Sequence, residues 1–150
     1  MTVGKSLSNG ADQFDLQRFV DAQDRVYATV IDELRGGRKR GHWIWFVFPQ
    51  LRGLGRSPTA LHYGIASLGE ARAYLAHDVL GPRLRECARL VAAIDDRSAE
   101  DIFGFPDDLK VRSSMTLFAL ATDDNADFIA VLDKFYNGEE DHVTVAQLAR

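Results

Sequence analysis

The sequence predicts a mainly helical protein of one domain, on three observations. Through most of the chain, apolar residues recur at the three- and four-residue spacing of a helix with one buried face. Residues that cap or break helices separate these stretches, and the loops between them are short. The length of 150 residues, with 46% hydrophobic and 27% charged residues, suits a single globular domain. We therefore expect about seven short helices packed compactly over residues 12–150.

The first eleven residues differ from the rest of the chain. Residues 1–11 are polar and rich in glycine and serine, without the apolar stretch of a secretion signal, so we expect a disordered polar tail. The longest apolar run, residues 43–48, is far shorter than the roughly 20 residues that a membrane helix needs. The single cysteine, Cys87, excludes an internal disulfide and lies at core spacing in a predicted helix. These features predict a cytoplasmic protein without a membrane segment.

The first predicted helix runs from Phe14 to Arg35. Its apolar residues follow helical spacing, and Gly36 and Gly37 end it where a left-handed cap is favoured. Gln23 lies in the middle of the apolar stripe, where a buried amide must find hydrogen-bond partners. Two interpretations remain open: Gln23 braces a neighbouring loop, or it faces a polar pocket. In both we expect it to contact residues 43–50.

Residues 43–48 give conflicting signals. Every residue there favours a strand, yet the only partner on offer is the weak candidate at residues 142–145. The propensity of these residues therefore predicts a strand, whereas the lack of a good partner strand argues against one.

The later helices are predicted from capping and breaking residues. Ser67 and Glu70 form a capping box, Ser98 begins a second cap, and Pro106 with two acidic residues suits a first helical turn. The expected helices run from the Ser67 cap to residue 75, from Gly81-Pro82 onward, around residues 102 and 103, from 106 to about 121, from 128 to 135, and from 144 to 148.

Several standard chemistries lack their motifs. The four histidines have no paired metal-ligand spacing, and there is no cysteine cluster, so we expect no metal site. Gly53-x-Gly55 lacks the third glycine and the preceding strand of a dinucleotide fingerprint, and the chain has neither a phosphate-binding Gly-Lys-Ser/Thr nor a G-x-S-x-G elbow. We therefore expect no cofactor.

Positive charge is concentrated in one segment. The net charge is −4, yet residues 35–56 contain six basic residues and no acidic one. The rest of the chain therefore carries 22 acidic against 12 basic residues. This segment would attract an anion, or it is a solvated basic loop.

Two clusters of polar residues are candidates for a site. In residues 38–57, His42 is of a type that titrates near neutrality, and Trp43 and Trp45 offer flat faces for stacking. Gln50 and Arg52 offer oriented donors, although the aromatic run also suits a core. In the second cluster, Asp108 and Arg112 recur at helical spacing and form a surface ion pair or part of an anion cradle facing the basic segment. The other polar residues of this cluster are Lys110, Ser113 and Ser114.

The sequence resembles domain-of-unknown-function family 1810, a family of small bacterial proteins. The most distinctive match is Gly41-His42-Trp43-x-Trp45-Phe46-x-Phe48-Pro49-Gln50, and a second is Asp107-Asp108-Leu109-Lys110-x-Arg112-Ser113-Ser114-Met115-Thr116. The resemblance implies an all-α fold, and therefore a helix rather than a strand at residues 43–48. It implies no activity, substrate or cofactor.

The expected function is the binding of an anionic, phosphate-bearing small molecule, such as a nucleotide or an ADP-ribose-like compound. Arg52, Lys110 and Arg112 would neutralise its charge, Trp43 would stack on it, and Gln23, Gln50, Ser113 and Ser114 would complete the site. His42 and Asp108 would be the acid and base if the protein were a hydrolase. The alternative is an interaction module that presents residues 35–56 to nucleic acid or an acidic protein. We expect nucleic-acid binding to be weak because the rest of the chain is acidic.

Overall fold

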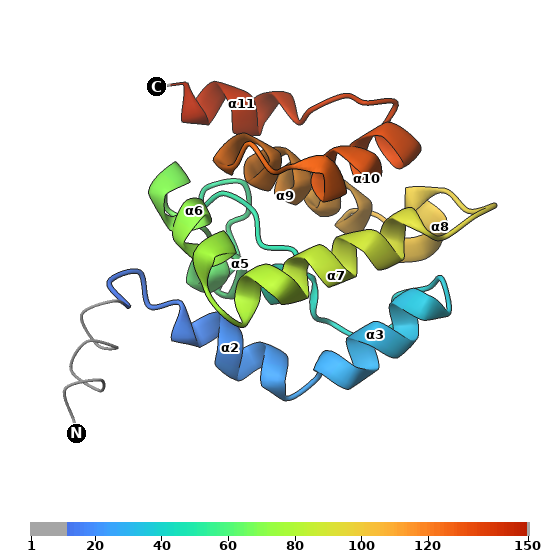
Figure 1. Cartoon of the computed structure of the whole chain (residues 1–150), viewed down its shortest axis with the longest axis horizontal. Helices are drawn as coiled ribbons and strands as arrows, with labels where there is room; N and C mark the ends of the chain where they lie inside the picture. The colour runs from blue at the N-terminus through green and yellow to red at the C-terminus, as the bar shows by residue number, and fades with distance from the viewer. Residues whose placement is uncertain (1–11, 150) are drawn as a thin grey trace.

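The computed structural model describes residues 12–149, in which ten helices surround one apolar core (Figure 1). The predicted polar tail, residues 1–11, lies outside the described residues. Within residues 12–149 there is no strand, only an isolated parallel bridge between Leu51 and Ile65, so the predicted all-α class is confirmed. None of the described helices combines the length and the apolar character needed to cross a membrane. The helices are α2 (Gln17–Asp24), α3 (Tyr27–Arg35), α4 (Ile44–Val47), α5 (Pro58–Tyr63), α6 (Leu68–Ala76), α7 (Leu80–Ala92), α8 (Ala99–Phe103), α9 (Asp107–Ala121), α10 (Ala126–Tyr136) and α11 (His142–Leu148).

Helix α9 is the centre of the packing. Every residue from Ser113 to Ala119 is buried, and α9 contacts α4, α6, α8, α10 and α11. Helix α7 crosses the middle of the view in Figure 1, with α2 and α3 on one side of it and α10 and α11 on the other. Because α9 contacts α4, it brings the second polar cluster next to the aromatic segment of the first.

The predicted helix Phe14–Arg35 is wrong in one respect, because it is two helices. The backbone of Val26 leaves the helical region, with φ −134° and ψ 0°, and its N–H bonds to the carbonyl of Gln23 in a tight turn. The two halves bury their apolar faces against different partners, α2 against α4 and α3 against α7. Packing therefore overrides the continuous helical periodicity of the sequence.

Residues 44–47 form the short helix α4, as the family resemblance implied and strand propensity did not. The N–H groups of Val47 and Phe48 bond to the carbonyls of Trp43 and Ile44, which closes one helical turn. The predicted helix at residue 68 begins at its Ser67 cap and ends at Ala76. Helix α5 was not predicted, although Ser57 followed by Pro58 is a cap signal that predicts a helix start.

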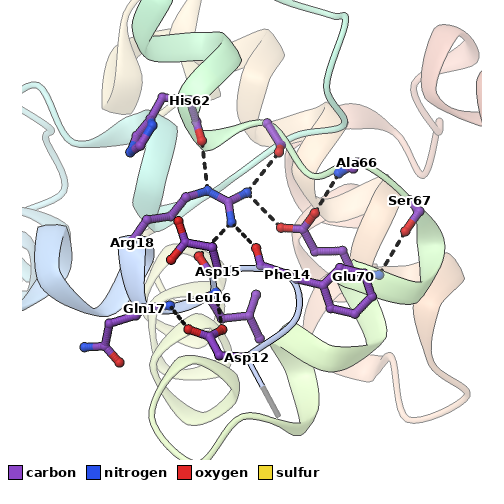
Figure 2. A network of polar contacts seen from close by, with 11 residues as sticks. Asp12, Phe14, Asp15, Leu16, Gln17, Arg18, His62, Ala66, Ser67 and Glu70 are labelled. Carbon is purple, nitrogen blue, oxygen red and sulfur yellow. Dashed lines mark hydrogen bonds and ion pairs between the residues drawn. The ribbon is translucent and has the colours of Figure 1, made fainter. Parts of the chain in front are cut away.

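A buried arginine ties the N-terminal turn to α5 and α6 (Figure 2). The guanidinium of Arg18 pairs with Glu70 at 2.8 Å, and the two side chains are 7% and 3% exposed. It also donates to the carbonyls of Phe14 and Asp15 and to those of His62 and Gly64.

The same contact changes the predicted capping box at Ser67. The Ser67 hydroxyl accepts the N–H of Glu70, as predicted, but the Glu70 carboxylate accepts from Ala66 N–H and Arg18 instead of capping Ser67. The box at Ser98 is complete, with Asp101 as the reciprocal partner.

A candidate anion site between α4, α5 and α9

A small hollow brings residues of the two predicted clusters together. Gln50 and Trp45 come from the first cluster segment, and Lys110 comes from the second, on α9. The volume of the hollow is about 10 Å³, room for roughly one water molecule. Its other walls are Ile44, Phe48, Ala60, Tyr63 and Gly64.

The hollow has an excess of positive charge at one end. The Lys110 ammonium lies 4.9 Å from the centre of the Trp45 ring and 3.3 Å from a carboxylate oxygen of Asp107. The other oxygen of Asp107 is 2.8 Å from the Lys39 ammonium, which in turn lies 5.4 Å from the centre of the Trp43 ring. The two ammonium groups therefore share the Asp107 carboxylate, and Lys39 also lies close enough to Glu33 to help lower the pKa of that carboxyl.

The expected stacking role of Trp43 does not fit its position. The Trp43 side chain is buried, at 2% exposure, and its indole N–H donates to Glu33 at 2.9 Å. The same Glu33 oxygen accepts the N–H groups of Arg40 and Gly41. Burial alone would raise the pKa of the Glu33 carboxyl, but these three donors hold that pKa below its ordinary value. Trp43 therefore fixes the loop before α4, and Trp45 is the tryptophan that lines the hollow.

The predicted contact between Gln23 and residues 43–50 is confirmed. The Gln23 amide donates to the carbonyl of Phe46 at 2.7 Å and to the hydroxyl of Tyr74 at 3.0 Å, and its oxygen accepts from Arg83 at 3.4 Å. At 2% exposure, Gln23 is a buried brace with its partners supplied by the protein. The pocket-facing interpretation, and with it the ligand role, does not fit this geometry.

Cys87 is a core residue, as predicted. It is fully buried, and burial raises the pKa of its thiol to about 12. At neutral pH the sulfur stays protonated, so it is a poor nucleophile.

Arg112 and Asp108 do not form the surface pair that their spacing suggested. Arg112 donates to the carbonyls of Glu139 and Glu140 and lies 3.4 Å from the Glu139 carboxylate. It therefore ties α9 to the link before α11. One carboxylate oxygen of Asp108 is buried and has no hydrogen-bond partner within residues 12–149, whereas its carbonyl accepts the Tyr136 hydroxyl at 2.6 Å.

Ser113 and Ser114 are buried in α9 rather than open to a ligand. Ser113 is 6% exposed and donates to the carbonyl of Leu109, as serines often do inside helices. Ser114 is fully buried, and its hydroxyl has no hydrogen-bond partner in the part of the chain that the structure describes. The expected cradle therefore reduces to Lys110, because both serines are buried.

The exposed residues of the basic segment lie at separate places. His42 and Arg52 are exposed and do not line the hollow. Arg52 borders a different depression, beside Ser67 and Gln147. Arg38 borders a third depression, near α8. Arg38 and Arg52 therefore do not belong to one anion-binding surface.

The depression at Arg38 is larger than the hollow but carries the wrong charge. Its volume is about 800 Å³, and two arginines face four carboxylates there, those of Asp95, Asp96, Glu100 and Asp101. An anion would be repelled by this balance. The smaller hollow, whose lining contains Lys110 and no carboxylate, therefore suits an anion better than the depression at Arg38 does. Among the described residues, no group of His, Cys, Asp and Glu is arranged to hold a metal ion.

These features define a small all-helical protein with a lysine and three aromatic rings at one hollow. The chain belongs to the family described as Protein of unknown function (DUF1810), whose sequence profile matches residues 13–148. It is also similar to a conserved hypothetical protein from Mycobacterium tuberculosis, known from a crystal structure. That similarity has a TM-score of 0.92 at 67% sequence identity and covers 93% of this chain and 99% of that chain. No curated protein matches the chain. The family resemblance seen in the motifs is thereby confirmed.

Proposed function

We propose that this protein binds an anionic, phosphate-bearing small molecule, such as a nucleotide or an ADP-ribose-like compound, at the hollow between α4, α5 and α9. One observation carries the proposal: Gln50 and Trp45 meet Lys110 there, and Lys110 shares the carboxylate of Asp107 with Lys39. An ammonium group that shares its carboxylate partner with a second lysine can also bind a phosphate. An aromatic ring beside it can stack on a planar group, such as a base, attached to that phosphate.

The proposal is one of binding rather than hydrolysis. The titratable side chains that line the hollow are those of Lys110 and Tyr63. The acid and base expected from sequence, His42 and Asp108, do not line it. We also keep a cytoplasmic location as a proposal, which the single, buried Cys87 supports.

Thermal unfolding with a panel of nucleotides and ADP-ribose tests the proposal. A compound present at 100 times its Kd should add about 2.7 kcal/mol to the free energy of unfolding. For a domain of this size, that raises Tm by roughly 5 to 10 °C. Lys110→Gln should abolish the shift with little effect on the unliganded Tm, because Asp107 keeps Lys39 as its partner.

The matched control is Lys134→Gln, which removes a lysine that pairs with Asp95 away from the hollow. This variant should keep the full ligand-induced shift. A panel in which no phosphate compound raises Tm would contradict the proposal. So would equal loss of the shift in both lysine variants.

A further inference from the structure

The two glutamines near α4 differ in their hydrogen bonding. Gln23 is buried, and the protein satisfies both ends of its amide. Gln50 is half-buried in a hollow with aromatic walls, yet neither end of its amide has a hydrogen-bond partner within residues 12–149. Water can reach both ends of the Gln50 amide, since the buried side-chain atoms without a partner among the described residues belong to Asp108 and Ser114. A donor and an acceptor therefore stand ready for a ligand, beside Lys110.

The hollow is too small for a ligand while its cover is in place, since it has room for roughly one water molecule. The chain leaves the core after Leu51 and returns at Ile65, where the two residues form a bridge. We name residues 52–61 of this loop the lid, because its residue Ala60 forms part of the wall of the hollow. The lid is fixed at its base: Arg52 N–H bonds to Ile65 O at 2.7 Å, and Ile65 N–H bonds to Gln50 O at 2.9 Å. Arg18 holds the carbonyl of His62, directly after the lid.

Between these fixed ends the lid is attached weakly. Helix α5, which contributes residues 58–61 to it, buries no residue, and Leu61 is 47% exposed. Within the lid, Gly55 lies close to Ala60, because a methyl group added at Gly55 would lie only 2.7 Å from Cβ of Ala60. The lid also touches the rest of the protein, since Leu54 packs against the core and α5 contacts α4. For a ligand to enter, the lid must lift about its base and release these contacts. Lifting the lid would remove Ala60 from the wall of the hollow. A ligand could then reach Trp45, Gln50 and Lys110, which line it.

Building on the proposed function, we propose that the hollow receives the adenine ring of an adenine nucleotide when the lid lifts. A glutamine amide matches adenine in two hydrogen bonds, because it accepts from the exocyclic amino group and donates to the neighbouring ring nitrogen N7. Aromatic side chains, here Trp45 and Tyr63, are surfaces on which any base stacks. The Lys110 ammonium binds the phosphate, and the free Gln50 amide selects the ring.

Isothermal titration of the full chain with AMP, IMP and ribose 5-phosphate tests this inference. IMP carries a carbonyl oxygen where AMP carries the amino group, so it offers no donor to the Gln50 oxygen. AMP should bind about tenfold more tightly than IMP, the ratio that corresponds to one well-formed pair of base contacts. Ribose 5-phosphate, which has no base, should bind more weakly than both. In Gln50→Leu, the AMP to IMP ratio should fall to within about twofold while ribose 5-phosphate affinity stays unchanged.

Other outcomes separate this inference from the proposed function. If the three compounds bind the natural protein equally, the adenine inference is overturned and anion binding stands. If Gln50→Leu keeps the AMP preference, Gln50 does not read the ring and the inference is wrong. If none of the three compounds binds, both the inference and the proposed function are overturned.

Discussion

Removal of the Arg18 guanidinium should be one of the most destabilising single changes in this protein. Arg18→Gln leaves the Glu70 carboxylate at 3% exposure without its cation, and it leaves the carbonyls of His62 and Gly64 with one donor fewer. Breaking a buried ion pair from one side costs about 3–5 kcal/mol. In a domain of this size, each kcal/mol lowers Tm by about 2–4 °C, so the expected loss is roughly 6–20 °C.

Urea and thermal unfolding of matched variants measure this effect. Arg89→Gln is the control, because Arg89 pairs with Asp127 while 64% exposed, and such a pair contributes about 0–1 kcal/mol. The double variant Arg18→Gln with Glu70→Gln should be more stable than Arg18→Gln alone, since no unpaired charge remains buried. A loss below about 1 kcal/mol for Arg18→Gln would refute the reasoning.

Four further predictions concern the brace, the α4 loop, the lid and the basic segment. Gln23→Leu should cost about 1–3 kcal/mol in urea unfolding, because it strands two buried partners; an unchanged midpoint would show that the brace is dispensable. The folded pKa of Glu33 lies below its unfolded value of 4.5, so its stabilisation is present above that pH and is lost as pH falls through the folded pKa. The free energy of unfolding should therefore fall less steeply at acid pH in Glu33→Gln than in the natural protein. The same pH dependence in both proteins would contradict this. Within residues 12–149, limited trypsin digestion should cut first after Arg52 and Arg56 in the lid, and a first cut elsewhere in that range would show that the lid is not the weakly held segment. Fluorescence anisotropy should find only weak binding of DNA or RNA at about 150 mM salt, and submicromolar affinity would promote the interaction-module alternative.

Helix positions could be predicted well from sequence because their signals are local. The cap at Ser98 and the run of apolar residues in α9 each specify their helix within a few residues. The break at Val26 could not be predicted in this way. Its cause is that α2 and α3 pack on different partners, which is a property of the tertiary structure. The helix at residues 44–47 could not be predicted from local propensity either. These residues favour a strand, but within residues 12–149 the fold offers them no partner strand.

The candidate site was predicted in part. Gln50 and Lys110 come from the two polar clusters of the sequence and line the same hollow, while their role in binding stays a prediction. Trp43 and Trp45 alternate in sequence, and only packing reveals that Trp43 is buried and Trp45 lines the hollow. Glu33 was missed because, on a predicted helix, it looks like an ordinary solvated acid, although it organises the whole loop before α4.

The two tryptophans provide the most direct test of the anion site. In a ¹H–¹⁵N spectrum each indole N–H gives one signal, and Trp45→Phe assigns them. During titration with ADP-ribose, the Trp45 signal should shift with ligand concentration, because Trp45 lines the hollow beside Lys110. The Trp43 signal should move much less, since its indole N–H stays bonded to Glu33 in the core. A Trp45 signal that stays fixed while ADP-ribose binds would place the ligand elsewhere and contradict the account.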